Sequence, residues 1–423
     1  MKNPSFDWLK LDNAAKIFPG QNSRTWSNVF RIGAQLKHEI DPQLLSAALK
    51  KTLVRIPSFN VRIRRGLFWY YFEQNPNELQ VLPDIKNPCY RIKFKENEGF
   101  LFRVFYRGNR ISIDVYHALC DGYGAAVFLS TLVGEYLRLK GEDIEYNQFV
   151  LDASEAPKAT ELEDSYSRYA DSKVPYDRKD KWVYHAKGTK MPMHMANFTA
   201  GIMSFKELHA ISKSYGVTVT EFLAALLMDV HYRKQLKEKK KQREICVQIP
   251  VNLRKAFPSE TLRNFVLCLR VKMNPNLGEY TFEEIVRSVS LQLRLANDPK
   301  LINSLMTQNM KLERNPVTKH LPLVIKDIGV AVSFLITAEQ TTTTLLSNLG
   351  PIILPESVEK HIDKMYLFTG PGIVNGARCG VASIGDKLAF TFSNCYKESD
   401  IEREFFTRLV KMGVHVKIES NRD

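Results

Sequence analysis

The alternation of hydrophobic and polar positions is clearest about a quarter of the way along the chain. Ile111, Ile113 and Val115 share one side of a predicted strand, because successive side chains of a strand point to opposite faces. His117 continues this apolar side. A polar loop follows, and then apolar positions at helical spacing until Gly141, where the predicted helix ends. The pattern predicts a strand, a tight loop and a long amphipathic helix, with His117 at the inner end of the strand.

Helix starts are also well marked elsewhere in the sequence. Asp41 can cap a helix, Pro42 suits its first turn, and Pro57 ends the apolar run that follows. Three other starts have the spacing of a capping box, in which Ser or Thr precedes Glu by three positions. These pairs are Thr218 with Glu221, Thr281 with Glu284, and Ser399 with Glu402. We expect a helix after each of them.

Strand-like runs alternate with these helices in both halves of the chain. Gly108-Asn109 separates two of the runs and is typical of a two-residue hairpin turn. The predicted strands cover residues 67–72, 90–94, 101–106, 111–117, 202–205, 245–249, 266–273, 330–336, 342–347 and 388–393. This mixture predicts an α/β class with α+β layering. Between residues 142 and 195 the apolar periodicity weakens, which indicates a long connection between two halves.

Length and composition fit a globular protein with more than one domain. A chain of 423 residues suits two or three domains, and its 44% hydrophobic and 25% charged residues are ordinary values. The sequence has no run of about 18 apolar residues, and its start lacks an apolar core of the signal-peptide type. We therefore expect no transmembrane segment and a cytoplasmic location.

The cysteines and histidines do not form a recognisable metal site. The six cysteines make no CxxC pair, and several lie in strand-like apolar runs, which favours buried reduced thiols over a disulfide framework or a zinc site. The histidines form neither an HxH nor an HExxH pattern. We expect no bound metal.

The charge balance is strongly basic. The chain has 60 Lys and Arg against 46 Asp and Glu, a formal net charge of +14 at pH 7. Such an excess attracts an anionic partner: nucleic acid, a membrane surface, a phosphorylated cofactor or an acidic carrier protein. The densest basic run, residues 234–243, contains no aromatic residues for base stacking, so it favours a solvated helix end and no nucleic acid is expected.

The strongest candidate for chemistry is His117 with Asp121 four positions later. An imidazole titrates near neutral pH, so His117 is a candidate general base. Gly122 and Gly124 allow a sharp turn into the following helix. The structural alternatives are a core histidine with satisfied hydrogen bonds at His117 and a helix cap at Asp121. Cys120 is interpreted as a small buried residue and not as a nucleophile.

Residues 117–122, HALCDG, match the HxxxDG core of the CoA-dependent acyltransferase superfamily. This superfamily contains chloramphenicol acetyltransferase, plant BAHD acyltransferases, alcohol acetyltransferases and the condensation domains of nonribosomal peptide synthetases. Residues 249–254, IPVNLR, followed by Asn264-Phe265, resemble the strand and arginine of these proteins. Residues 347–351, SNLGP, are similar to the SNxGP segment of the alcohol acetyltransferase and condensation-type branch. The resemblance spans most of the chain.

The sequence departs from the family pattern in two places. Many members carry HHxxxDG, and here Tyr116 replaces the first histidine. The family assigns the base to the second histidine, which corresponds to His117. A DFGWG motif of the BAHD type is absent from the sequence, which argues against the plant branch.

The resemblance implies two chloramphenicol-acetyltransferase-like subdomains with a tunnel between them and His117 near its middle. We expect an N-terminal subdomain carrying HxxxDG at residues 1–165, a connecting segment at residues 166–195, and a C-terminal subdomain at residues 196–423. The weakly patterned connection near the middle of the chain agrees with this layout.

The resemblance also implies roles for individual residues. His117 would act as general base, and Asp121 would pair with Arg254 and, with Gly122, support the loop that orients the histidine. Ser347 and Asn348 are candidates for oxyanion or substrate contacts. The family has no permanently bound cofactor; acyl-CoA or acyl-phosphopantetheine is a co-substrate.

Three hypotheses about function follow. The first is an acyltransferase that moves an acyl group from acyl-CoA to a hydroxyl or amine of a small acceptor, in the manner of the alcohol O-acetyltransferases. The second is a condensation-type transferase whose donor is a phosphopantetheinyl carrier protein acting in trans; carrier proteins are typically acidic, so the basic charge fits this donor too. The third is a non-catalytic scaffold that retains the fold.

Overall fold

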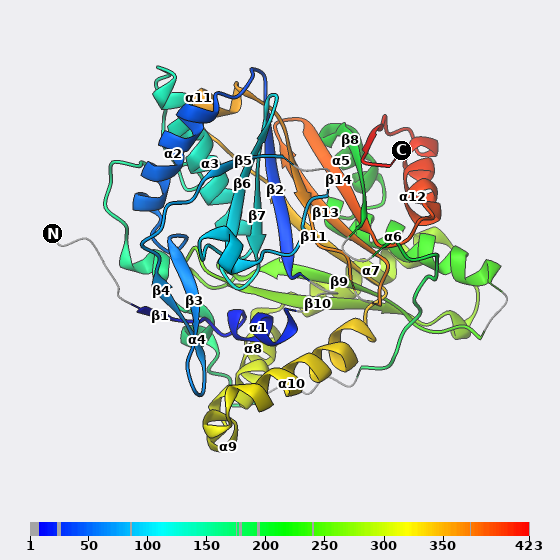
Figure 1. Ribbon diagram of the computed structural model, residues 1–423. Coiled ribbons are helices and arrows are strands. Elements are labelled where there is room, and N and C mark those ends of the chain that lie inside the picture. Colours follow the sequence, from blue (N-terminus) through cyan, green and yellow to red (C-terminus); the bar gives the residue numbers. More distant parts are fainter. Residues whose placement is uncertain are drawn as a thin grey trace.

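A computed structural model describes residues 8–22, 27–84, 87–174, 176, 180–192, 195–238, 241–372 and 374–422. These residues form two large mixed sheets and one small sheet, with helices packed around them (Figure 1). Parts of two predicted segments lie outside the described residues: positions 239–240 of the basic run, and positions 175, 177–179 and 193–194 of the connecting segment. The α/β class expected from the sequence is confirmed.

The first large sheet has five strands. Their order is β12 (Ile362–Phe368), β2 (Val29–Leu36), β7 (Arg110–Tyr116), β6 (Phe102–Arg107) and β5 (Val81–Pro83). Neighbouring strands are antiparallel except for the parallel pair of β5 and β6. Helix α3 (Gly122–Leu139) packs on β2 and β7, and α2 (Pro42–Arg55) packs on α3. The predicted hairpin between β6 and β7 is confirmed, and Gly108 at its turn has φ +54°.

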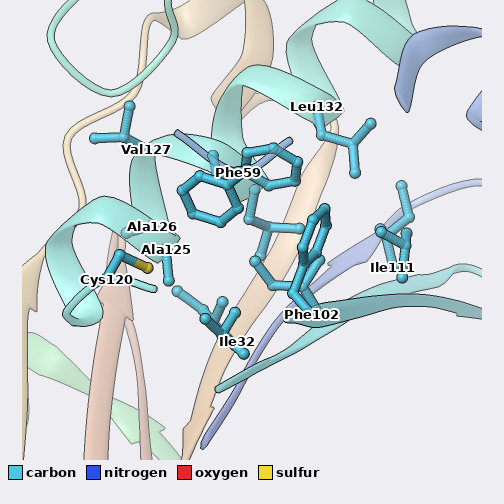
Figure 2. Packing of buried hydrophobic residues seen from close by; sticks show 14 of the residues in the cluster. Ile32, Phe59, Phe102, Ile111, Cys120, Ala125, Ala126, Val127 and Leu132 are labelled. Atoms are coloured by element: carbon cyan, nitrogen blue, oxygen red, sulfur yellow. The ribbon is translucent and has the colours of Figure 1, made fainter. Parts of the chain in front are cut away.

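Helix α3 is buried along nearly its whole length, which fixes the loop that precedes it. Figure 2 shows Phe59 and Phe102 packed together with residues of α3. The rings of Phe59 and Phe128 stack with centroids 4.1 Å apart, and Phe102 meets Phe128 edge-on at 5.1 Å. Aromatic pairs in these geometries add to the free energy of area burial. The unit of β7, the following loop and α3 is therefore held rigidly, as the core of an N-terminal layer.

The second large sheet has seven strands and forms the core of the C-terminal part. Their order is β10 (Val266–Met273), β9 (Ile245–Asn252), β11 (Thr344–Pro351), β13 (Ala377–Ile384), β14 (Lys387–Asn394), β8 (Asn197–Ser204) and β15 (Lys417–Ser420). Its packed helices are α5 (Phe205–Ser214), α6 (Val219–Lys237), α7 (Phe282–Ala296) and α12 (Asp400–Lys411). Parallel pairing occurs on both sides of β11.

The remaining elements lie mainly around the gap between these layers. The small sheet consists of β1 (Trp8–Lys10), β4 (Tyr70–Gln74) and β3 (Val61–Arg65). The α-helices are α1 (Phe18–Gln21), α4 (Ser165–Tyr169), α8 (Pro299–Arg314), α9 (Pro316–His320), α10 (Leu323–Phe334) and α11 (Glu356–Glu359). Short 3-10 turns are η1 (Ala15–Ile17), η2 (Phe94–Asn97), η3 (Ala159–Leu162), η4 (Leu253–Lys255) and η5 (Pro275–Leu277), and η6 (Leu335–Glu339) is a π-helical turn. Helix α1 contacts α10.

Three of the four predicted helix starts are confirmed in detail. Asp41 accepts hydrogen bonds from the backbone of Gln43 and Leu44, and the capping boxes at Thr218 and Thr281 are complete. The box predicted at Ser399 is wrong, although α12 begins after it, because Ser399 makes no side-chain cap bond. The carboxylate of Glu402 is instead engaged by Asn394 and Arg422, which are elsewhere in the fold.

Most predicted strands are confirmed with shifted ends, but two are wrong. Residues 330–336 belong to α10 and η6, and residues 90–94 form no strand. The sequence VAVSFLI in the first segment has β-branched residues at alternate positions, yet tertiary packing places it in a helix beside α1. The strand predicted at residues 67–72 begins only at Tyr70, because residues 66–69 form the turn of the β3–β4 hairpin.

The two halves of the chain are not fully separate in space. Strand β12 belongs to the C-terminal half of the sequence but pairs with β2 in the five-stranded sheet. The boundaries at residues 165 and 195 stay a prediction. Across the described ranges, every helix is too short or too polar to cross a bilayer.

Candidate functional site

A large cavity lies where the N-terminal and C-terminal layers meet. Its volume is about 1760 Å³. Phe30 of β2 lines one part of it, Gln248 of β9 another, and Phe334 of α10 a third. Five of the six candidate residues line this cavity: His117, Asp121, Gly122, Ser347 and Asn348. Arg254, the sixth, is buried against Asp121. The cavity can therefore admit a sizeable ligand next to the imidazole.

His117 is held at the end of β7 by backbone and aromatic contacts. Its backbone N–H donates to the carbonyl of Asn28 at 2.8 Å. Its ring stacks on Phe18 with centroids 4.7 Å apart and meets Phe30 edge-on at 5.1 Å. The side chain is only partly buried and lines the cavity. The ring therefore has a fixed orientation and an open route to a ligand.

The protonation of His117 follows from its contact with Asn264. Nδ1 lies 3.2 Å from Oδ1 of Asn264, and because an amide oxygen only accepts, the geometry assigns the ring proton to Nδ1. Nε2 then carries a lone pair. Burial lowers the pKa of His117 from its ordinary 6.5, against smaller raising effects that include Asp121 and Asn264. The ring is a neutral base at pH 7.

A buried carboxylate orients Asn264 in turn. The amide nitrogen of Asn264 donates weakly to Oδ2 of Asp12 and to the carbonyl of Ala118, each at 3.4 Å. Burial raises the pKa of Asp12 to about 6, although Arg263 at 3.6 Å opposes this shift. The sequence predicts neither role, because Asn264 is distinguished only by its place before Phe265 and nothing in the local pattern marks Asp12.

Asp12 also positions the aromatic ring that stacks on His117. Its Oδ1 accepts a hydrogen bond from the backbone N–H of Ala15 at 2.8 Å, at the start of η1. Turn η1 leads directly into α1, whose first residue is Phe18. One buried carboxylate thus connects to both the polar and the aromatic neighbours of the imidazole.

Asp121 ties the N-terminus of α3 to the C-terminal layer. Its Oδ2 accepts from Arg254 Nη1 and from the backbone N–H of Phe265, both at 2.8 Å. Its Oδ1 accepts from the backbone N–H of Gly124 at 3.0 Å, so the residue also caps α3. The ion pair that the family resemblance implies is present, and the helix-cap interpretation holds as well.

Every nitrogen of the Arg254 guanidinium donates a hydrogen bond at this contact between the layers. Its Nε donates to the carbonyl of Thr261 at 2.9 Å and its Nη2 to that of Arg263 at 2.6 Å. The guanidinium lies 4.6 Å from the ring centroid of Tyr123, a cation–π contact. Removing either partner of the pair would leave a buried charge without compensation.

Two glycines let α3 approach the C-terminal layer closely. A Cβ on Gly122 would lie 2.5 Å from the side chain of Leu349, and one on Gly124 would lie 2.1 Å from the carbonyl oxygen of Leu262. From the sequence, we expect glycine at these two positions because the chain turns sharply. The structure shows a second reason for glycine there, since no larger residue fits between the layers without movement.

Ser347 and Asn348 differ in how far their side chains are engaged. The amide nitrogen of Asn348 donates to Thr220 Oγ1 at 2.9 Å, and its oxygen accepts from the backbone N–H of Gly350 at 2.8 Å. Ser347 Oγ has no hydrogen-bond partner among the described residues. Asn348 thus holds the strand in place, whereas the hydroxyl of Ser347 remains available to a ligand.

Tyr116 and Cys120 are parts of the core. Tyr116 is buried, and its ring meets Phe94 edge-on at 5.2 Å. Cys120 is buried within the hydrophobic cluster that Figure 2 shows, and burial raises the pKa of its thiol. All six cysteines are free. Among the described residues, no group of three or more potential ligands could hold a metal ion.

Comparisons with known proteins identify the fold. No protein-family model matches the sequence, and no curated protein matches it. Polyketide synthase associated protein 5 from Mycobacterium tuberculosis is similar in structure, with TM-score 0.58, 14% identity, and 95% of this chain and 97% of that chain covered. The wax ester synthase/diacylglycerol acyltransferase from Marinobacter aquaeolei VT8 aligns with TM-score 0.56, 14% identity, and 96% and 100% coverage.

TRI101 from F. graminearum, solved in complex with ethyl coenzyme A, aligns with TM-score 0.63, 11% identity, and coverage of 97% of this chain and 99% of that chain. Structural similarity at such low sequence identity establishes the fold but does not establish the activity. The three structures nevertheless span nearly the whole chain. The protein therefore shares the fold of these three structures over nearly its whole length, and this is the α/β fold that the resemblance of residues 117–122 leads us to expect.

Proposed function

We propose that the protein is an acyltransferase that moves an acyl group from a thioester, acyl-CoA in the first instance, to a hydroxyl or amine of a small acceptor. The observation that carries this proposal is a neutral imidazole at the wall of a large cavity. Its Nδ1 proton is engaged by Asn264, so the lone pair of Nε2 is free to accept a proton. This is the arrangement that a general base requires.

The reaction balances with His117 as the only proton carrier. Nε2 accepts the proton of the acceptor O–H or N–H while the acceptor oxygen or nitrogen attacks the thioester carbonyl carbon. The tetrahedral intermediate then collapses, the C–S bond breaks, and the leaving thiolate takes the proton back from Nε2. Burial disfavours the imidazolium, which promotes this return. A positioned base of this type contributes roughly a hundred- to ten-thousand-fold in rate.

The hydroxyl of Ser347 is our candidate donor to the oxyanion of the intermediate. It lies in the same cavity as His117 and has no competing partner among the described residues. Losing one donor of this kind typically costs about two to three orders of magnitude in kcat. Asn348 supports the same strand through Thr220 and Gly350.

Lys311 is exposed at the cavity lining and could bind the phosphates of the donor, and the net charge of +14 favours an anionic co-substrate. TRI101, which shares the fold, was solved with a coenzyme A derivative. A carrier protein bearing acyl-phosphopantetheine is the second candidate donor, since its acidic surface would match the same positive charge. The scaffold hypothesis is disfavoured by the open Nε2 of His117 in the cavity.

A thermal-shift titration tests the donor class. Free CoA, acetyl-CoA and a series of longer acyl-CoAs are added to the protein. A ligand at about one hundred times its dissociation constant stabilises a fold by roughly 2.7 kcal/mol, which raises Tm measurably. We expect saturable stabilisation by acyl-CoA, and the preferred chain length reports the size of the acyl pocket. No shift with any acyl-CoA would contradict CoA as donor; an acylated carrier protein is then titrated in the same way.

A further inference from the structure

Helix α10 has an apolar face that points away from the cavity. Val324, Ile328 and Val332 recur every four residues and are 56%, 62% and 52% exposed. None of the three lines the cavity, whereas Leu323 and Phe334 on the opposite side of the helix do. Residues four apart lie on one face of a helix, so the three form a stripe. Figure 1 shows α10 along the lower edge of the molecule.

Two further groups of exposed apolar side chains extend the stripe. Leu335 and Ile336 continue it beyond α10, and Leu67 and Trp69 project from the tip of the β3–β4 hairpin. Three hydrogen bonds join the hairpin to α10: Leu323 N–H to Leu67 O at 3.1 Å, Lys326 Nζ to Phe68 O at 2.8 Å, and Tyr70 Oη to Asp327 Oδ2 at 2.7 Å. We call these seven residues, namely Leu67, Trp69, Val324, Ile328, Val332, Leu335 and Ile336, the apolar platform.

Cations flank the apolar platform. Arg64 and Arg65 lie next to the hairpin tip, and Lys319 lies in the last turn of α9, the helix that precedes α10; all three are exposed. Glu73 forms salt bridges with Arg62 and Arg64, so Arg64 is already balanced, and Asp327 keeps its negative charge while it accepts from the hydroxyl of Tyr70. Among the described residues, Arg65 and Lys319 make no salt bridge, and they supply the positive charge at the margin of the platform.

We propose that the apolar platform docks on the surface of an anionic lipid bilayer. Its aliphatic side chains would enter the boundary between headgroups and acyl chains, and Trp69 would lie at the headgroup level, where tryptophan is enriched. Arg65 and Lys319 would contact the anionic headgroups. Exposed contiguous apolar surface of this type marks an interaction site, and the net charge of +14 selects a negative partner.

Two other occupants fit the observations less well. A second copy of this chain would bring the same arginine and lysine against their own counterparts, and like charges at an interface are unfavourable. An acidic protein would match the cations. The stripe on α10, however, consists of Val and Ile, whereas the residues that dominate protein interfaces are Trp, Tyr and Arg, with Val under-represented. The composition favours lipid.

Trp69 of the platform also belongs to the cavity lining, together with Phe68 of the hairpin tip and Leu323 and Ile325 of α10. The platform and the cavity therefore meet at this side chain. A lipid-soluble substrate could pass from the bilayer along these side chains toward His117. This last consequence rests on the proposed function, whereas the docking itself does not.

Vesicle flotation tests the docking without any turnover. The full chain is mixed with vesicles of phosphatidylcholine alone, or of phosphatidylcholine and phosphatidylglycerol in equal amounts, at low and high salt. We expect flotation with the anionic mixture, weakening with salt. Ile328→Glu and Val332→Glu should each lower the bound fraction about tenfold, because an apolar contact is replaced by a like charge. Both positions are exposed, so the variants should fold, which circular dichroism verifies.

A matched control makes the test specific. Leu291 on α7 is 59% exposed and far from the platform in sequence, so Leu291→Glu adds the same charge elsewhere and should float as the wild type does. Three results would overturn the proposal. They are no flotation of the wild type with the anionic mixture, an equal loss in Leu291→Glu, and a wild-type dimer in sedimentation that Ile328→Glu dissociates.

Discussion

The amide oxygen of Asn264 lies 3.2 Å from Nδ1 of His117 and fixes which nitrogen of the imidazole carries the proton. A catalytic histidine is often oriented by a carboxylate, but here the nearest sequence candidate, Asp121, is occupied by Arg254 and by backbone N–H groups. An amide oriented by a second, buried carboxylate at Asp12 takes that position instead. The orienting group is therefore neutral, which leaves the low pKa of the imidazole in place.

Asn264→Ala should lower kcat about tenfold with little change in KM. The variant frees the imidazole to rotate and to place its proton on Nε2, so fewer molecules present a lone pair to the acceptor, while donor binding is unaffected. Steady-state kinetics with saturating acyl donor measures the two constants. Asn276→Ala, in an exposed turn, is the control. A rise in KM with unchanged kcat would contradict the positioning role.

Activity should persist well into the acidic range. The folded pKa of His117 is below 6.5, so its neutral form, and with it kcat/KM, is retained as the pH falls through 6.5 and is lost only at the lowered folded pKa. The free energy of unfolding, in contrast, should fall over the same pH range. An unfolded histidine takes up a proton below pH 6.5 that folded His117 does not, so this residue destabilises the fold as the pH falls from 6.5 to the folded pKa. A pH profile of kcat/KM, with a Tm series over the same range, measures both. An inflection above 6.5 would contradict the assignment.

Asp121→Ala should lower the free energy of unfolding by about 3–5 kcal/mol, because it leaves the buried guanidinium of Arg254 without its anion. Chemical denaturation measures the change. The control is Glu78→Ala, which removes the exposed partner of Lys50 and should cost less than about 1 kcal/mol. Equal effects of the two substitutions would show that the Asp121–Arg254 pair does not hold the layers together.

The two glycines at the start of α3 should respond differently to alanine. Gly122→Ala meets the movable end of Leu349, whereas Gly124→Ala meets the backbone carbonyl of Leu262. We expect a cost near the lower end of about 1–3 kcal/mol at Gly122 and a larger one at Gly124. Adding Leu349→Ala should restore part of the loss at Gly122 only. Denaturation curves of the two glycine variants, each with and without Leu349→Ala and compared at constant m-value, measure these changes.

Tyr116→Phe should leave stability unchanged or raise it slightly. The hydroxyl of Tyr116 is buried and has no hydrogen-bond partner within the described ranges of the chain, so removing it deletes an uncompensated desolvation cost. The ring contact with Phe94 is kept. Thermal denaturation measures the change, and a clear fall in Tm would contradict this interpretation of the hydroxyl.

The sequence alone predicts the parts of the site that depend on local pattern. The strand that ends before His117, the loop and the helix capped by Asp121 follow from periodicity and capping chemistry, and all three are present. The parts of the site that the sequence does not predict depend on contacts between distant parts of the chain. Asn264 is 147 positions from His117, and Asp12 is 252 positions from Asn264, so no local signal connects them.

The wrong strand at residues 330–336 has a related cause. β-Branched residues at alternate positions favour a strand in isolation. In the fold, however, this segment lies between the cavity and solvent, where Phe334 lines the cavity and Val332 is exposed on the other side. In that position a helix pairs its backbone N–H and C=O groups internally, whereas a single strand would leave them without hydrogen bonds.

The most direct test of the central claim is a single-turnover measurement of acyl transfer by the wild type and by His117→Ala. The acyl-CoA that gives the largest thermal shift is incubated with excess enzyme and a panel of alcohols and amines, and mass spectrometry follows the acylated product. Because His117 contributes no ion pair, the variant should keep its Tm and its acyl-CoA shift but transfer at least about a hundredfold more slowly. Transfer at the wild-type rate by a folded His117→Ala variant would contradict the assignment of His117 as the base.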